Sequence, residues 1–142
     1  MEITQVKSLV PGELDQVNVL YSQLSSTGLH ATSEKANNAF NDPGFNLVIA
    51  KESNQIVGMG SLVAITFLSS KHANIEDVVV DQRYRGQGLG RRIMERLIEL
   101  AKEQGIEEIH LTSKPAREAA NALYQKLGFT RKETNVYSLP LS

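Results

Sequence analysis

The fold is decided by one stretch, Ile75-Glu-Asp-Val-Val-Val-Asp-Gln-Arg-Tyr-Arg-Gly-Gln-Gly-Leu-Gly-Arg-Arg-Ile-Met94. It begins with a β-branched run, Val78-Val79-Val80, which predicts a strand. A basic, glycine-rich turn follows, and from Leu89 onward the apolar residues recur at helical spacing. A strand, a glycine turn and a helix together form a ready anion site, because the first amides of a helix lack internal acceptors and the helix dipole is positive there.

Two familiar phosphate-binding loops do not fit this turn. A Walker loop needs Lys-Ser/Thr after its last glycine, whereas Gly90 is followed by Arg91-Arg92. A dinucleotide-binding G-x-G-x-x-G needs a third glycine at position 91 or 93, counting from Gly86 or Gly88, and those positions hold Arg91 and Ile93. The pattern that remains is R-x-x-G-x-G.

Composition limits the classes of protein that this chain can form. A length of 142 residues predicts a single domain over residues 1–142, and 41% hydrophobic residues suffice for an ordinary core. The net charge of −1 argues against a nucleic-acid binder, and the lack of cysteine excludes disulfides, thiolate metal sites and cysteine nucleophiles. With no signal peptide and no membrane-spanning run, we expect a cytoplasmic protein without a membrane partner. Basic residues nonetheless cluster around the glycine turn: Arg83, Arg85, Arg91, Arg92 and Arg96.

Periodicity and turn residues predict an α+β chain. We expect strands over residues 2–10, 45–51, 56–67, 74–81, 107–112 and 129–139, and helices over residues 14–25, 33–40, 89–104 and 113–127, with a polar turn over residues 26–30. Ser33 is the predicted N-cap of the second helix, and Gly58 and Gly60 predict a bulge or a close backbone approach. Short turns join the second, third and fourth strands, so these should be antiparallel. The helix that connects the fourth and fifth strands should make those two parallel.

The R-x-x-G-x-G pattern of Arg85, Gly88 and Gly90 resembles the acyl-CoA pyrophosphate loop of the GNAT superfamily of N-acetyltransferases. A second stretch, Asn121-Ala-Leu-Tyr124-Gln-Lys-Leu-Gly128-Phe129, is similar to the other signature of that family. Within the superfamily, the run Ile75 to Val80 and the short C-terminus most resemble small bacterial members and glucosamine-phosphate N-acetyltransferases. The resemblance implies the GNAT fold: a mixed, mostly antiparallel sheet of six to seven strands with a central parallel pair, and about four helices.

The resemblance also implies an acetyl-CoA-dependent N-acetyltransferase that uses no metal and transfers the acetyl group directly to an amine. The implied cofactor-binding residues are the backbone of Val78, Val79 and Val80 for the pantetheine arm, the amides of Arg85, Gly86, Gln87, Gly88, Leu89, Gly90 and Arg91 for the pyrophosphate, and Asn121 and Tyr124. Tyr124 is the implied catalytic residue that donates a proton to, or hydrogen-bonds, the CoA sulfur. No acyl-enzyme is expected, since the chain lacks cysteine and shows no Ser/His nucleophile arrangement.

The general base is sought among residues near the valine run. Strand alternation places Glu76 and Asp77 on opposite faces, so only one of them can point into a given site, and we favour Glu76 as the second catalytic residue. Either carboxylate can equally be a solvent-facing strand residue or the cap of a turn. His72 and His110 are further candidates, although a lone histidine is more often structural.

Other readings and partners stay open at this point. The chain can instead be a non-catalytic acyl-CoA-binding sensor or interaction module, or a nucleotide-binding domain, which the missing Lys-Ser/Thr disfavours. The acceptor can be an aminosugar phosphate, a small amine or amino acid, or a protein amine. Lys71, Lys114 and Arg117 could bind a sugar phosphate or form a charged rim. The apolar residues 135–139 predict an exposed edge strand that pairs two copies into a homodimer.

Overall fold

The computed structural model describes residues 1–25 and 27–142, which form two compact units, residues 1–111 and residues 112–142. The first unit holds β1 (Glu2–Val6), α1 (Pro11–Leu24), α2 (Ser33–Asn41), β2 (Phe45–Glu52), β3 (Gln55–Thr66), β4 (Lys71–Val80), the 3-10 turn η1 (Gln82–Tyr84), α3 (Leu89–Glu103) and β5 (Glu108–His110). The second unit holds α4 (Glu118–Lys126). The polar turn predicted from Ser26 begins at a residue outside those described.

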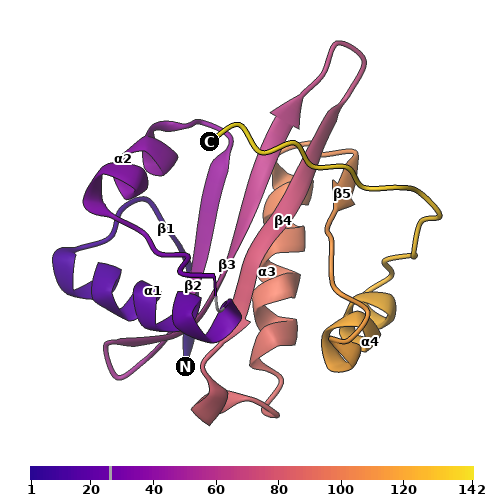
Figure 1. Ribbon diagram of the computed structural model, residues 1–142. Coiled ribbons are helices and arrows are strands. Elements are labelled where there is room, and N and C mark those ends of the chain that lie inside the picture. Colours follow the sequence, from indigo (N-terminus) through magenta and orange to yellow (C-terminus); the bar gives the residue numbers. More distant parts are fainter. Residues whose placement is uncertain (26) are drawn as a thin grey trace. The chain divides into compact units, whose positions relative to one another are not determined.

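One sheet organises the first unit. Its strands lie in chain order, β1-β2-β3-β4-β5, with the first four antiparallel and β5 parallel to β4. The predicted meander and the predicted parallel pair are therefore both confirmed. Helices α1 and α2 lie on one face of the sheet and α3 on the other (Figure 1).

The two faces of the sheet are packed differently. On the α1 face, Val17 and Leu20 of the helix pack against Leu47, Met59 and Val79 of three strands. On the α3 face, glycines replace side chains: a Cβ built on Gly58 would lie 2.8 Å from Ile93 Cδ1, and one on Gly60 would lie 2.9 Å from Leu97 Cδ1. The close approach predicted at these glycines is thus confirmed, and it lets α3 lie directly on β3.

The predicted sheet of six to seven strands is wrong, because the sheet has five. Residues 129–142 are all described and contain no strand, so the strand predicted over residues 129–139 does not form. As a result, β5 is the edge of the sheet and the parallel pair is not central. An apolar pattern permits a strand, but the ladder needs a hydrogen-bonding neighbour that local sequence does not specify.

Several element boundaries also differ from prediction. The first strand ends at Val6, and the first helix already begins at Pro11, since proline is well suited to the first helical position. Thr32, not Ser33, caps α2, because its hydroxyl accepts from the Lys35 amide. The last helix begins at Glu118, several residues after the predicted start. None of the helices in the described ranges has the length and apolar character needed to cross a membrane.

Candidate active site

The glycine turn lies where β4 ends and α3 begins. Gly86 and Gly88 both have φ of +78°, in the left-handed region that favours glycine, and Gly88 is the residue that precedes α3. Within the described part of the chain, the amides of residues 86–91 make no backbone hydrogen bond. Six unpaired donors at the positive end of a 15-residue helix form a site that suits a phosphate or pyrophosphate.

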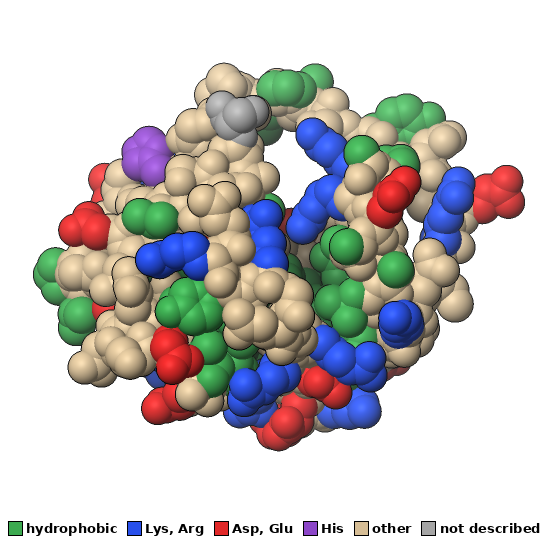
Figure 2. Space-filling model, turned by 90° about the horizontal axis from the view of Figure 1, so that it is seen from below, with side chains coloured by type: hydrophobic (Ala, Val, Ile, Leu, Met, Phe, Trp, Pro, Cys, Tyr) green, Lys and Arg blue, Asp and Glu red, His purple; other side chains and the backbone are tan. Residues whose placement is uncertain are grey.

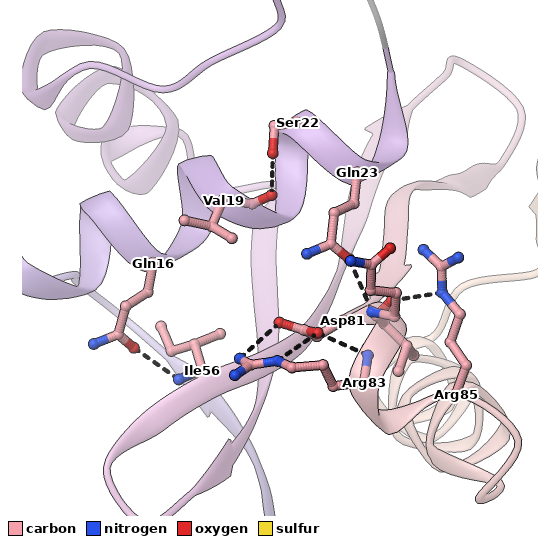
Figure 3. Close-up of polar contacts among 10 residues, drawn as sticks. Gln16, Val19, Ser22, Gln23, Ile56, Asp81, Arg83 and Arg85 are labelled. Carbon is pink, nitrogen blue, oxygen red and sulfur yellow. Dashed lines mark hydrogen bonds and ion pairs between the residues drawn. The ribbon is translucent and has the colours of Figure 1, made fainter.

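A buried carboxylate holds the start of this turn in place. Asp81 is 3% exposed and accepts hydrogen bonds from the amide, Nε and Nη2 of Arg83 (Figure 3). These bonds lower the pKa of Asp81 below its ordinary value, so the carboxylate is charged at neutral pH. Gln23 of α1 accepts a hydrogen bond from the Gln82 amide at 2.8 Å, which ties α1 to η1.

The predicted basic cluster is mostly committed to partners within the chain. Arg83 pairs with Asp81, and Arg85 Nε donates to the Val80 carbonyl at 2.9 Å across the base of the turn (Figure 3). Arg91 and Arg96 pair with glutamates one turn further along α3. Figure 2, seen from the end of the sheet where this turn lies, shows basic side chains interspersed with acidic and neutral ones. An anion bound at this turn would therefore be held first by the backbone amides.

The outer edge of β4 is open beside the turn. β5 pairs with β4 only at residues 72–74, from His72 opposite Glu108 to Asn74 opposite His110. Beyond Asn74, from Ile75 to Val80, β4 has no β5 residue opposite it in the described chain. This stretch includes Val78, Val79 and Val80, whose backbone is the predicted partner of the pantetheine amides. A linear, amide-bearing ligand could add to such an edge as an extra strand does.

A bulge changes the direction of the carboxylates on β4. Met59 lies opposite Val79, while Ser61, two residues along β3, lies opposite Glu76, so three steps of β4 match two of β3. Residues opposite each other share a face, and Met59 and Val79 face α1, so Glu76 faces α1 as well. Asp77, with φ of +55°, accepts a 2.8 Å hydrogen bond from Tyr21 Oη of α1.

The prediction that Glu76 and Asp77 lie on opposite faces is therefore wrong. Strand alternation holds only for an unbroken ladder, and the bulge inserts one residue at Asp77. Glu76 remains exposed to solvent, yet its pKa is raised by partial burial and, second, by the neighbouring Asp77 charge. A carboxylate that is accessible and more basic than usual is suited to accept a proton.

The second unit contains the other two predicted site residues. Asn121 uses its amide nitrogen locally, donating to the carbonyls of Lys114 at 3.0 Å and Arg117 at 2.8 Å, which ties the segment before α4 to the helix. Tyr124 packs edge to face on Phe129, with ring centroids 6.1 Å apart. Its hydroxyl makes no hydrogen bond within the described residues, and burial raises its pKa, so it is protonated at neutral pH.

The other residues predicted as candidates, His72, His110 and Lys71, lie away from the glycine turn. His72 and His110 have ring centroids 5.4 Å apart at the far end of the β4–β5 pair, and His110 contacts Glu108. Lys71 Nζ lies 3.4 Å from the Gln104 carbonyl. No group of three or more metal-ligating side chains occurs in the ranges described.

Sequence reasoning missed Tyr21 and Gln23 as parts of this site. Tyr21 lies in the helix predicted over residues 14–25, and that helix forms, but nothing local indicates a partner 56 residues away. Asp81 was recognised only as the end of a strand. An aspartate often caps a turn by accepting a hydrogen bond from the amide two residues later, as Asp81 does from Arg83. That tendency could have indicated the role of Asp81 in the turn.

A family model described as the acetyltransferase (GNAT) family matches residues 15–129. Over 62 residues the chain is 45% identical to the probable glucosamine 6-phosphate N-acetyltransferase 2 of Oryza sativa subsp. japonica, covering 44% of this chain and 36% of the relative. It is 36% identical over 72 residues to the [ribosomal protein bS18]-alanine N-acetyltransferase of Escherichia coli K12, covering 51% of this chain and 49% of that protein. The chain thus spans between about a third and a half of these relatives' length.

Among solved structures, a putative acetyltransferase from Agrobacterium tumefaciens str. C58 superimposes with a TM-score of 0.84 at 24% identity. The match covers 99% of this chain and 100% of that one. At this identity the similarity concerns the fold alone.

Proposed function

Because the chain belongs to the acetyltransferase (GNAT) family, with a model match over residues 15–129, we propose that it transfers the acetyl group of acetyl-CoA to a primary amine. Family membership implies acetyl transfer to an amine; the use of acetyl-CoA, the residue roles and the acceptor are our proposal. The matched residues span both compact units, and we propose that residues 1–142 act as one acetyltransferase domain.

One observation supports the proposal: in the described chain the six amides of residues 86–91, just before α3 and in its first turn, make no backbone hydrogen bond. The unpaired edge of β4 precedes this turn in the chain. CoA is a linear molecule in which a pyrophosphate joins the nucleotide to the pantetheine arm, and this arm contains two amides. The amides of residues 85–91 would bind the pyrophosphate, and the backbone of residues 78–80 would pair with the pantetheine amides. Asn121 has its side-chain oxygen available to accept a hydrogen bond from the arm, since in the described chain only its Nδ2 makes hydrogen bonds.

The reaction needs two proton movements. The lone pair of the neutral amine attacks the thioester carbonyl carbon, so that a C–N bond forms and the C–S bond breaks. The proton lost by the amine passes to the Glu76 carboxylate, and the leaving thiolate takes a proton from the Tyr124 hydroxyl. Solvent then returns the proton of Glu76 to Tyr124, and the products are an acetamide and free CoA. A backbone amide of Val79 or Val80 would stabilise the developing oxyanion.

Release of CoA thiol from acetyl-CoA tests the proposal. The chain has no cysteine, so a thiol reagent detects no protein background. The two relatives named above suggest the first acceptors, glucosamine 6-phosphate and a peptide with an N-terminal alanine, and polyamines, amino acids and aminoglycosides complete the panel. Acceptor-dependent release establishes the enzyme. Absence of release with every acceptor, together with no acetyl-CoA-dependent rise in melting temperature, contradicts the acyl-CoA proposal.

Tyr124→Phe separates an enzyme from a non-catalytic acyl-CoA sensor. Removing the hydroxyl should lower kcat by about a hundredfold to ten-thousandfold, in line with the loss of a general acid, while the dissociation constant for CoA stays within about twofold. Tyr137→Phe is a matched control, because Tyr137 is 88% exposed. A Tyr124→Phe variant with unchanged kcat would remove Tyr124 from the mechanism. A wild-type protein that binds acetyl-CoA and acetylates nothing would support the sensor.

We also propose a homodimer, supported by the exposed apolar side chains near the C-terminus, of which Val136, Tyr137, Leu139 and Leu141 are 76% to 91% exposed. Apolar side chains gathered on one segment favour association with another surface. Sedimentation equilibrium at micromolar concentration should give the mass of two chains. A mass of one chain would contradict the proposal.

A further inference from the structure

The feature that carries a further inference is the hydrogen bond between Tyr21 of α1 and Asp77 of β4. Tyr21 Oη lies 2.8 Å from Asp77 Oδ2, although the two residues are 56 positions apart in the chain. The bond joins the helix that covers this face of the sheet to the bulged residue of β4. Both residues belong to the same compact unit, residues 1–111.

Asp77 needs an external contact to keep its conformation. Its φ of +55° lies in the left-handed region, which a non-glycine residue adopts at a cost of roughly 1 kcal/mol or more. The Tyr21 hydroxyl is a donor aimed at the carboxylate, and a hydrogen bond to a charged group is stronger than one to a neutral group. The phenol is partly buried and next to the carboxylate, and both effects raise its pKa, so Tyr21 stays protonated and remains a donor.

The bulge brings Asp77 next to Glu76 on the α1 face. In an unbroken strand these two carboxylates would point to opposite faces, whereas here both face the helix that carries Tyr21. Tyr21 therefore holds the side chain that is the immediate charged neighbour of Glu76.

Few other titratable groups act on Glu76 from the elements packed against β4. β3 contributes none, because residues Gln55–Thr66 include no titratable side chain. α3 covers the opposite face of the sheet, and β5 ends opposite Asn74, two residues short of Glu76. Within the described chain, Asp77 is thus the charged group that acts on Glu76, and Tyr21 of α1 is the group that donates to Asp77.

We propose that Tyr21 is a positioning residue for amine acetylation: through its hydrogen bond it keeps Asp77 in the bulge beside Glu76, so that Glu76 is held as the proton acceptor for the amine. The inference rests on the proposed function, in which Glu76 is the base. Tyr21 itself touches neither the amine nor CoA in this proposal. Through this hydrogen bond α1, which is far from the glycine turn in sequence, would contribute to the reaction.

The test compares Tyr21→Phe and Asp77→Asn with wild type and with the control Tyr137→Phe. Asp77→Asn keeps a residue that tolerates the left-handed conformation and a side-chain oxygen for Tyr21, but it removes the charge. Because a nearby negative charge raises the pKa of Glu76, its removal should move the acidic limb of the kcat/KM profile to lower pH. Tyr21→Phe should move this limb in the same direction by less, and should lower kcat/KM for the amine about tenfold, with KM for acetyl-CoA within twofold.

A titration of the Glu76 carboxyl carbon by NMR, with its signal identified by Glu76→Gln, gives a readout that needs no activity. If both variants lower the pKa of Glu76, the coupling of Tyr21 and Asp77 to Glu76 is supported, whether or not any amine is acetylated. A protein that shows this coupling but acetylates no amine would overturn the proposed function alone. If wild type is active and the rates, pH profiles and Glu76 titration of Tyr21→Phe and Asp77→Asn match it, the positioning role is overturned. Should Tyr21→Phe fail to fold, Asp77→Asn decides by the same readouts.

Discussion

Replacing Gly88 by alanine isolates the contribution of backbone conformation to the glycine turn. Gly88 has φ of +78° and ψ of 10°, and a Cβ built there meets no atom within 4 Å. No packing clash is therefore added, and the cost is the left-handed conformation alone, about 1–2 kcal/mol. This free-energy cost can lower either folding stability or CoA affinity. If the turn of Gly88→Ala keeps its shape without ligand, the variant is less stable. If the turn relaxes without ligand, the variant binds CoA more weakly.

The sum of the two losses in Gly88→Ala should therefore be about 1–2 kcal/mol. If the whole sum falls on binding, the dissociation constant for CoA rises roughly 5- to 30-fold. If it falls on folding, the melting temperature drops by about 2–8 °C for a chain of this size. Calorimetric titration with CoA and urea denaturation measure the two parts separately.

Two further variants make the Gly88 experiment decisive. Gly12→Ala is the matched control: Gly12 lies in the first turn of α1, has no neighbour within 4 Å of a built Cβ and does not have positive φ. That variant should keep its CoA affinity and gain up to about 1 kcal/mol of stability. Gly88→Asn should lose less than Gly88→Ala, since asparagine tolerates the left-handed region. A summed loss below about 0.5 kcal/mol in Gly88→Ala would refute the strain argument.

Two other substitutions test the packing and the charge that position the site. Gly60→Ala should destabilise the fold by about 1–3 kcal/mol in urea denaturation, because the added methyl group overpacks the contact between β3 and α3; a variant as stable as Gly12→Ala would contradict that contact. Asp81→Asn should cost about 1–2 kcal/mol at pH 7, since it loses the charged hydrogen bonds from Arg83. The folded-state pKa of Asp81 is lowered, so this stabilisation is complete above the unfolded pKa of about 3.9 and disappears as pH falls through the lower folded value. The difference between wild type and Asp81→Asn should accordingly shrink below about pH 4, and a difference that is constant with pH would show that the carboxylate charge does not matter.

Local signals predicted most of the fold. Alternation, helical spacing and turn residues located the strands β2, β3 and β4 and the helix α3, whose predicted end at residue 104 is one residue beyond the observed Glu103. The β2–β3 hairpin followed from the polar turn at residues 52–55, where Ser53 and Asn54 both adopt positive φ. These features depend on residues a few positions apart, and so they can be read from the chain.

The C-terminal strand shows where local patterns fail. Residues 135–139 have an apolar composition like that of the observed strands, yet they form none. A helix satisfies its hydrogen bonds within the segment, whereas a strand needs a neighbour, and that neighbour is chosen by the tertiary structure.

The candidate site divides in the same way. The sequence alone determined the glycine turn and its helix, because glycine at positive φ followed by an amphipathic segment is a local arrangement. Only the tertiary structure decided that Glu76 and Asp77 share a face and that Tyr21 holds Asp77, since a bulge depends on the register between two strands and the hydrogen bond joins residues 56 positions apart. Register and long-range contacts are set when the elements pack, and a single strand's residues do not encode them.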